Sequence, residues 1–222
     1  MTEGTEVTEV TTRYGLGRWH IDEPSGRAIA QLAIGHGAGG GVESPVLNVV
    51  AEAMVAAGFR VGSFEQPWRV SGRRIAGPPA QLDAAWCESM PVFADLALPL
   101  VVGGRSAGAR VACRTSGAVA ALAVVALAFP LHPPGRPDKS RVAELPTGPV
   151  LVVQGDRDPS GSAVEVVEAG SGCAGLTVLP IPGADHSLRV WRQGPITQRE
   201  ADEILALGVR RWALSTVRGN HR

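Results

Sequence analysis

The sequence predicts an α/β fold, in which an open, doubly wound and mostly parallel sheet has about six or seven strands. Short apolar runs alternate along the chain with segments of helical character. Such alternation implies crossover connections, which make neighbouring strands parallel. The runs LPLVV (98–102) and PVLVV (149–153) are continuously apolar, as is typical of parallel strands that are buried on both faces.

Each predicted element has its own local signal, taken in order along the chain. The first helix begins at Pro45 and stops before Gly58, and the last helix begins with a capping box, Thr197 followed by Glu200. A weaker pattern around residues 17–23 predicts an antiparallel edge strand. Strands are expected at 28–34, 59–64, 98–102, 122–128, 150–153 and 176–180, and helices at 45–57, 80–94, 106–115, 162–168 and 198–216.

Length and charge limit the possible classes of function. The 222 residues suit one domain, which we place at 13–218, between a flexible, polar leader (1–12) and a short tail (219–222). Lys plus Arg and Asp plus Glu are both 21, so the net charge is zero. A general nucleic-acid binder or a polybasic membrane-surface protein would need a basic surplus. We therefore expect neither a nucleic-acid nor a membrane partner.

Processing and cysteine signals point to the cytoplasm. The leader has neither a basic region nor an apolar region, so it is unlike a secretory signal. The longest apolar run, 122–131, is far shorter than the roughly 20 residues that span a bilayer. The cysteines Cys87, Cys113 and Cys173 lie far apart without metal-ligand spacing. We expect a reduced, cytoplasmic protein with no metal and no cofactor.

The string GRSAG (104–108) predicts a nucleophile. It follows an apolar strand directly and opens a helix directly, which is the strand–turn–helix placement of a nucleophile elbow. A sharp turn would present the Ser106 hydroxyl at the carboxyl edge of the sheet, and the small residues on either side would let strand and helix approach closely. A glycine-rich turn without chemistry is the alternative.

A serine nucleophile needs a base. In hydrolases that have a nucleophile elbow, the order along the chain is the serine, then the acid, then the histidine. Only His132 and His186 lie between Ser106 and the terminal tail. His186 follows the last predicted strand, at the expected edge of the sheet, and is the predicted base. His132 lies in a proline-rich loop after the preceding strand, from which it could reach the site, although a structural role is favoured for it.

The acid that orients the base should follow the strand at 150–153. Two aspartates compete there, and we favour Asp158, which is deeper in the loop and precedes a proline, over Asp156 at the strand exit. Asp185 is a weaker third candidate, because side chains adjacent in sequence to His186 diverge from it.

Two backbone N–H groups are needed to stabilise an oxyanion. One should be that of Ala107, after the nucleophile. The other should come from the glycine-rich loop at 36–41, where we choose Ala38, with Gly37 as the near alternative and as a substrate-contacting residue. This loop lacks the GK[ST] ending of a phosphate loop, so a nucleotide-binding role is disfavoured.

Taken together, these loops resemble the α/β-hydrolase superfamily. The match is closer to a small, lidless group of serine hydrolases that resemble dienelactone hydrolases in size. That group includes the hydrolase-like domain of an NSL chromatin-complex subunit and a testis-expressed protein of animals. The resemblance implies Ser106 as nucleophile, Asp158 as acid and His186 as base. It rests on GHGAGG (35–40), SGRR (71–74), GGRSAGAR (103–110), FPLHPPGRP (129–137), VQGDRDPSG (153–161) and ADHSL (184–188).

The sequence also predicts some features of the substrate. About twenty residues separate Phe129 from Val150, too few for the helical lid that many such hydrolases carry. An open site favours small or exposed acyl groups. Arginines near the predicted edge could pair with an anionic substrate group, and an aromatic side chain could line an acyl pocket. The candidate arginines are Arg69, Arg73, Arg74 and Arg105, and the candidate aromatic residue is Trp68. The alternatives are that the arginines are solvated or paired within the protein and that Trp68 anchors its loop by packing.

The predicted function is a serine hydrolase that cleaves an ester, thioester or lactone of a small-molecule acyl substrate through an acyl-enzyme, as a monomer or homodimer. The alternative is a catalytically silent module that keeps the fold for protein interaction.

Overall fold

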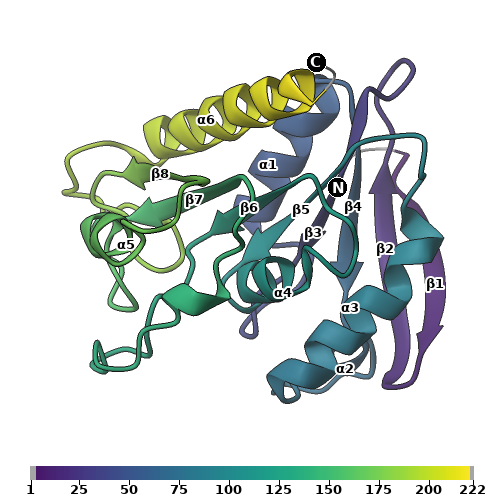
Figure 1. The fold of residues 1–222 in the computed structure, drawn as a ribbon, viewed down its shortest axis with the longest axis horizontal. Helices are drawn as coiled ribbons and strands as arrows, with labels where there is room; N and C mark the ends of the chain where they lie inside the picture. Colours follow the sequence, from purple (N-terminus) through teal and green to yellow (C-terminus); the bar gives the residue numbers. More distant parts are fainter. Residues whose placement is uncertain (1–3, 221–222) are drawn as a thin grey trace.

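The computed structural model describes residues 4–220 and contains one eight-stranded sheet (Figure 1). Its strand order is β1-β2-β4-β3-β5-β6-β7-β8. The predicted α/β class is confirmed, with slightly more strands than the expected six or seven. The strands are β1 (Glu6–Thr12), β2 (Gly15–Asp22), β3 (Ala30–Gly35), β4 (Phe59–Glu65), β5 (Leu100–Arg105), β6 (Ala123–Leu127), β7 (Val150–Gly155) and β8 (Leu176–Ile181).

Strands β3 to β8 pair in parallel, whereas β2 pairs antiparallel with both β1 and β4. Every residue of β3, β6 and β7 is buried. Their continuous apolar sequences are therefore explained by helices that cover both faces of the sheet. The weak strand predicted around 17–23 is present as β2, but it is not the edge strand, because β1 lies outside it.

The prediction of a flexible leader at 1–12 is wrong for residues 6–12. Glu6–Thr12 forms β1, and Val10 packs in the same buried cluster as Trp19 of β2. A half-exposed antiparallel strand needs only alternate apolar residues, so its polar sequence resembled disorder. Residues 1–3 of the leader and residues 221–222 of the predicted tail lie outside the described residues, and the last helix continues through Gly219.

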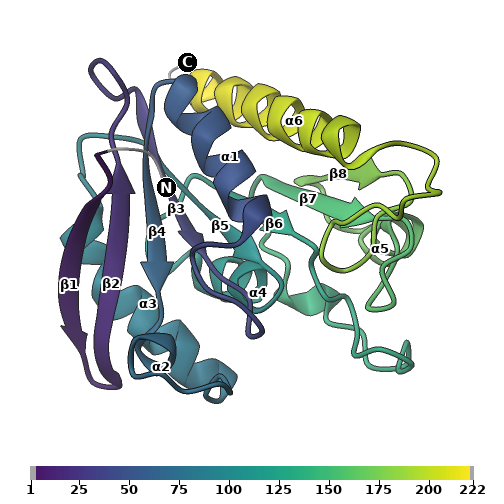
Figure 2. The same ribbon diagram turned by 180° about the vertical axis from the view of Figure 1, so that it is seen from behind.

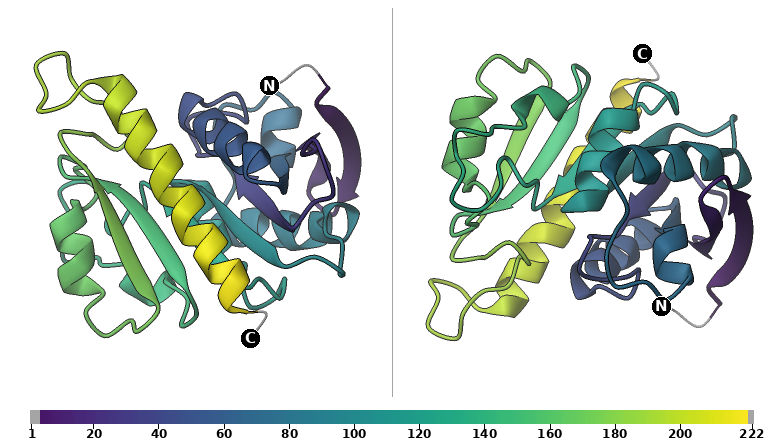
Figure 3. Two further views of the ribbon diagram at one scale, coloured as in Figure 1. Left: turned by 90° about the horizontal axis from the view of Figure 1, so that it is seen from above. Right: turned by 90° about the horizontal axis from the view of Figure 1, so that it is seen from below.

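The helices form two layers. Helices α1 and α6 pack on one face of the sheet, and α3, α4 and α5 pack on the other (Figures 1 and 2). Seen from above, α6 runs across its face of the sheet (Figure 3). Capping boxes open α5, at Ser162, and α6, at the predicted Thr197–Glu200 pair. The helices are α1 (Pro45–Ala56), α2 (Pro67–Val70), α3 (Pro79–Phe93), α4 (Ala107–Thr115), α5 (Ala163–Ala169) and α6 (Gln198–Gly219).

The segment between β6 and β7 is held against the body of the protein. It contains one short 3-10 turn, η1 (Val142–Glu144), in which Glu144 forms ion pairs with Arg110 and Arg114 of α4. Arg114 also pairs with Asp83 of α3. The segment has no room for a separate lid domain, and these ion pairs fix it beside α4.

The parallel strands direct four loops to one edge. The chain leaves β3, β5, β7 and β8 at their carboxyl ends, and open α/β sheets bind ligands outside those ends. Among residues 4–220, no helix combines the length and apolar character that a membrane crossing requires.

Candidate active site

Ser106 occupies a strained turn between β5 and α4. Its backbone φ is 53° and its ψ is −109°, a conformation that non-glycine residues rarely adopt outside functional sites. The Ser106 N–H donates to the carbonyl of Leu127 at 2.9 Å, which ties the turn to the end of β6. The strand–turn–helix geometry expected of a nucleophile elbow is therefore present at the predicted residue.

Two glycines make this turn possible. A Cβ atom on Gly104 would lie 2.4 Å from the Gly35 carbonyl oxygen, and one on Gly108 would lie 2.2 Å from the same oxygen. Gly104 also has a φ of 156°. Strand β3 and helix α4 thus approach each other so closely that neither position can carry a side chain without movement of the backbone.

The structure brings Ser106, His186 and Asp158 into one chain of hydrogen-bond contacts. Ser106 Oγ lies 2.9 Å from His186 Nε2, and His186 Nδ1 lies 2.7 Å from Asp158 Oδ2. The His186 side chain is 29% exposed, whereas the Asp158 side chain has no exposed surface. A buried carboxylate at Nδ1 directs the other ring nitrogen to act as acceptor toward the serine hydroxyl.

The Asp158 carboxylate is held by more than the histidine. Gln154 Nε2 donates to Oδ2 at 2.9 Å, and the Ser160 N–H donates to Oδ1 at 2.7 Å. Gln154 also donates to the Gly161 carbonyl at 2.6 Å. These donors compensate the burial of the charge and fix the orientation of the carboxylate.

The two competing aspartates have other partners. Asp156 Oδ1 accepts from the Gly183 N–H at 2.7 Å, and Asp185 Oδ1 accepts from the Ser187 N–H at 2.7 Å. Each therefore shapes the backbone of the loop that carries His186, and neither lies at Nδ1 of that ring.

Backbone contacts join the loop after β7, called the acid loop because it carries the predicted acid Asp158, to the loop after β8, called the base loop because it carries the predicted base His186. The Arg157 N–H donates to the Ala184 carbonyl at 3.0 Å. A Cβ on Gly155 would lie 2.2 Å from the same carbonyl oxygen, so a glycine is required where the two loops meet. The loops after β7 and β8 consequently form one packed unit.

The two residues predicted to donate to the oxyanion lie at one cavity. Ala38 and Ala107 both line a small cavity of about 10 Å³. Within the described part of the chain, neither backbone N–H donates to another group. Ala107 is also the first residue of α4, where free N–H groups favour negative charge. Gly37 lies against the elbow, because a Cβ placed on it would be 3.5 Å from Ser106 Cβ.

His36 supports the loop that carries Ala38. Its ring is buried, with Nδ1 2.9 Å from the Gly37 carbonyl and Nε2 accepting from the Gln66 N–H at 3.1 Å. These contacts assign the proton to Nδ1 of a neutral ring. Burial lowers the pKa of His36, which outweighs the opposing hydrogen bond to Gly37 and the charge of Glu65.

The remaining predicted substrate-contacting residues are distributed around the edge. Trp68 is buried against His36, with ring centroids 5.4 Å apart, and lines the same small cavity as Ala38 and Ala107. His132 is buried beside the acid loop, where its backbone N–H donates to the Ser160 carbonyl at 3.0 Å. Its position suits a structural contact of the acid loop.

The arginines do not form one group. Arg73 and Arg74 are exposed, and Arg69 lies 3.2 Å from the carboxylate of Glu43. Arg105, in contrast, reaches the base loop, where its Nη2 lies 3.3 Å from the His186 carbonyl oxygen and 3.1 Å from Ser187 Oγ. Arg105 and Ser187 line a larger cavity of about 510 Å³ beside the elbow.

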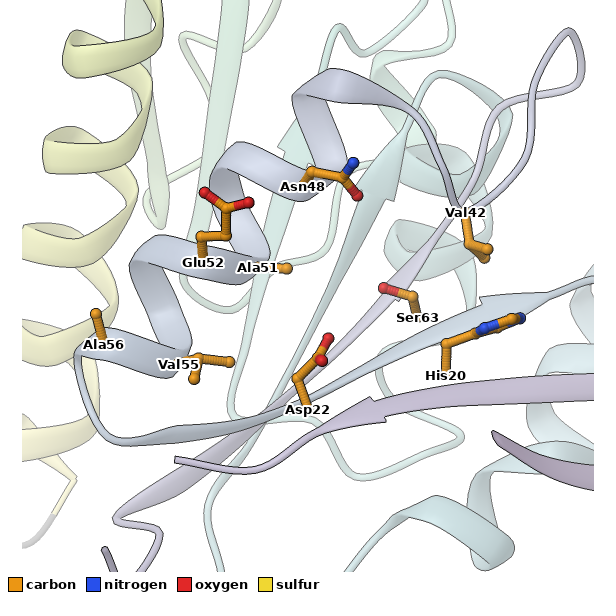
Figure 4. A pocket seen from close by; sticks show the side chains of 9 residues that line it. All are labelled: His20, Asp22, Val42, Asn48, Ala51, Glu52, Val55, Ala56 and Ser63. Carbon is orange, nitrogen blue, oxygen red and sulfur yellow. The ribbon is translucent and has the colours of Figure 1, made fainter. Parts of the chain in front are cut away.

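A further cavity of about 190 Å³ lies between α1 and the strands β2 and β4 (Figure 4). The side chain of Asp22 rises from β2 toward α1 in this view. None of its lining residues belongs to the Ser106–His186–Asp158 set. Among residues 4–220, no group of three or more histidine, cysteine or acidic residues is arranged to hold a metal ion.

Comparison with known proteins identifies the family. A family model for the α/β-hydrolase domain matches residues 28–213. The chain belongs to the α/β-hydrolase family. The matched region contains all four loops of this α/β-hydrolase that meet at the carboxyl edge of the sheet. A comparison with curated protein sequences finds no match.

Solved structures share the fold of this α/β-hydrolase. A lidless α/β serine hydrolase from Xanthomonas campestris is 18% identical, with a TM-score of 0.72 and 96% of each chain covered. Est1E from Butyrivibrio proteoclasticus is 14% identical, with a TM-score of 0.75 and 95% of this chain and 98% of that chain covered. One structure of Est1E holds ferulic acid.

A dienelactone hydrolase from Anabaena variabilis is also similar, at 18% identity and a TM-score of 0.70, with 95% of this chain and 97% of that chain covered. The expected resemblance to small, lidless hydrolases of this kind is confirmed. The relation to the NSL-complex subunit stays a prediction.

Two residues of this α/β-hydrolase that shape the site were not predicted from the sequence. Gln154 is fully buried, and its signal is a polar residue at the end of an apolar run, which must find partners in the interior. In the sequence, His36 stands only as the first residue of the glycine-rich loop. Its signal is a histidine directly after the buried strand β3, at the site edge.

Proposed function

We propose that this α/β-hydrolase is a serine hydrolase that cleaves a small or exposed carboxylic ester, thioester or lactone through an acyl-enzyme on Ser106. The observation that carries the proposal is the continuous contact from Ser106 Oγ through the His186 ring to Asp158, at 2.9 and 2.7 Å. This is the arrangement by which a base activates a serine and an acid orients the base.

In the first half-reaction, Ser106 Oγ attacks the carbonyl carbon of the substrate while its proton moves to His186 Nε2. The Oγ–C bond forms, and the carbonyl electron pair moves to oxygen. The N–H groups of Ala38 and Ala107 stabilise that oxyanion, and the buried Asp158 carboxylate stabilises the imidazolium. The bond to the leaving group then breaks, and the leaving oxygen or sulfur takes the proton from His186.

In the second half-reaction, water replaces the leaving group. His186 Nε2 accepts a proton from the water as its oxygen bonds to the acyl carbon. Collapse of the second oxyanion breaks the Oγ–C bond, the proton returns to Ser106, and the carboxylic acid product leaves.

The cavities support a preference for short acyl groups. The cavity that Ala38 and Ala107 line is about 10 Å³, which is too small for a long acyl chain. The larger cavity includes charged side chains, among them Arg105 and Arg189, which a long apolar chain would have to pass. In a series of p-nitrophenyl esters, we expect kcat/KM to be highest for acetate or propionate and to fall toward octanoate; a rising series would contradict this preference.

A fluorophosphonate probe tests the proposed function directly, because it reacts only with an activated serine. We expect the wild-type protein to be labelled and Ser106→Ala to lose both labelling and ester hydrolysis. Ser25→Ala changes an exposed serine and is the matched control, which should behave as wild type. Absence of labelling in the wild type would reject the proposal and favour the silent interaction module.

A further inference from the structure

Arg105 places a positive charge beside the proposed nucleophile. It is the residue before Ser106, and its side chain turns back toward the site rather than to bulk water. Nη2 contacts the His186 carbonyl and Ser187 Oγ, and Nη1 would lie 3.2 Å from a Cβ atom on Gly37. The guanidinium is therefore enclosed between the base loop and the loop at 36–41.

This charge has no carboxylate partner among the described residues. No ion pair within 4.0 Å involves Arg105, and its buried Nε has no hydrogen-bond acceptor. Burial lowers the pKa of Arg105, although Asp185 and Asp158 act in the opposite direction. The carboxylates of Asp185 and Asp158 accept hydrogen bonds from backbone N–H groups and lie against His186 rather than against the guanidinium. The guanidinium is thus partly desolvated and has no carboxylate of residues 4–220 in direct contact, although these two charges act on it from a distance.

The cavity next to Arg105 is large enough for part of a small substrate. Its volume is about 510 Å³, and Arg189 adds a second guanidinium that forms no ion pair with a described residue. Of the two lining carboxylates, Glu43 pairs with Arg69, whereas Asp202 accepts a hydrogen bond from the neutral amide of Gln198 and keeps its negative charge. Within the part of the chain that the structure describes, two guanidiniums without an ion pair therefore face one unpaired carboxylate, which leaves a net positive charge at the cavity.

We propose that the substrate of this hydrolase carries an anionic group, of the carboxylate or phosphate kind, that binds Arg105 with support from Arg189 in the cavity beside Ser106. The inference rests on the proposed serine-hydrolase function and adds a class of substrate to it. A guanidinium is suited to this role because it stays charged and presents several donors in a fixed plane to an oxyanion.

Matched esters test the proposal. One pair is p-nitrophenyl hemisuccinate and the p-nitrophenyl methyl ester of succinate, which differ in charge on the acyl part. The second pair is 4-acetoxybenzoate and its methyl ester, which differ in charge on the leaving group. We expect the wild-type kcat/KM to favour the charged ester in at least one pair by roughly tenfold or more, as a charge-assisted hydrogen bond allows.

Three variants separate anion binding from a purely structural role of Arg105. Arg105→Gln should abolish the preference for the charged ester, mainly through KM, and Arg105→Lys should restore part of it. Arg199→Gln removes an exposed charge on α6 and should keep the wild-type ratio. If Arg105→Gln slows both esters of a pair equally, Arg105 acts only on the position of His186 and the proposal is overturned.

A binding measurement identifies the anion. Succinate and inorganic phosphate should each be tested for protection of Ser106 against the fluorophosphonate probe. We expect at least one of them to slow labelling of the wild type and to lose this effect in Arg105→Gln; protection by neither overturns the proposal. Failure of the proposed function itself would be recognised separately, because the probe would then not label Ser106 at all.

Discussion

Asp158 Oδ2 lies 2.7 Å from His186 Nδ1 and also accepts a hydrogen bond from Gln154, although the Asp158 side chain has no exposed surface. A carboxylate in this position holds one tautomer of the ring and stabilises its cation. The acid is therefore part of a buried polar network that extends behind the histidine, and its removal should affect both chemistry and folding.

Asp158→Asn should lower kcat by about 10⁴-fold, because an amide at this position favours the wrong tautomer of the histidine. The rate of hydrolysis of a short activated ester is the measurement. Asp156→Asn is the matched control, since an amide oxygen can still accept from the Gly183 N–H, and we expect it to keep kcat within about tenfold of wild type. A larger loss in the Asp156 variant than in the Asp158 variant would reverse the assignment of the acid.

Gln154→Met should destabilise the fold by about 1–3 kcal/mol, because Asp158 Oδ2 and the Gly161 carbonyl each lose a buried donor. Urea unfolding at pH 7 measures the free energy. Gln198→Met provides a comparison at a partly exposed glutamine, where the loss should be smaller. Equal losses in the two variants would show that the burial of Gln154 carries no special cost.

Gly108→Ala should lower the free energy of unfolding by about 3 kcal/mol or prevent folding, because the new Cβ would lie 2.2 Å from the Gly35 carbonyl oxygen. Gly117→Ala introduces the same atom where nothing lies within 4 Å. We expect that control to change the stability by no more than about 0.5 kcal/mol. Denaturant unfolding compares the two, and a stable Gly108→Ala protein would contradict the close approach of β3 and α4.

The stability of the protein should decrease as the pH falls below the usual histidine pKa of 6.5. Burial lowers the pKa of His36 in the folded state, so between the two pKa values the unfolded chain binds more protons. The stabilisation is present above pH 6.5 and is lost as the pH falls toward the folded-state pKa. We expect this decrease in urea unfolding free energies measured between pH 7.5 and 5.

His36→Asn isolates this contribution. The variant should be less stable than wild type at pH 7.5, because the Gln66 N–H loses its acceptor, but its stability should fall less on acidification. If the unfolding free energies of the two proteins fall equally with pH, a group other than His36 controls the loss of stability at low pH.

The sequence predicted the four edge loops well, because parallel strands place their carboxyl ends together. The helix that follows Ser106 and the loops that contain Asp158 and His186 could be located once the order of strands was known. The choice of Asp158 over Asp156 was not determined by spacing alone. It depended on how the loop turns after Gly155, where the base loop packs against a position that has no Cβ.

Other features could not be predicted, for physical reasons that differ. Strand β1 is polar because only one of its faces is buried, and alternation over seven residues is a weak signal. The separation of Arg105, at the end of β5, from Arg73 and Arg74 depends on the path of a loop and on side-chain directions, which hydrophobic periodicity does not encode. The partners of Gln154 required the three-dimensional positions of Asp158 and Gly161.

Because the loops after β7 and β8 form one packed unit, the residues of the site fall into two groups that lie far apart in the sequence. Ser106 and both proposed oxyanion donors lie before residue 110, whereas the proposed acid and base, Asp158 and His186, come from the last third of the sequence. A fragment that ends in the segment between β6 and β7 contains Ser106 without the proposed base, and the complementary fragment contains the proposed base without Ser106. We expect each fragment alone to be inactive, and hydrolysis by the two fragments expressed together would measure how well the halves of the sheet reassemble.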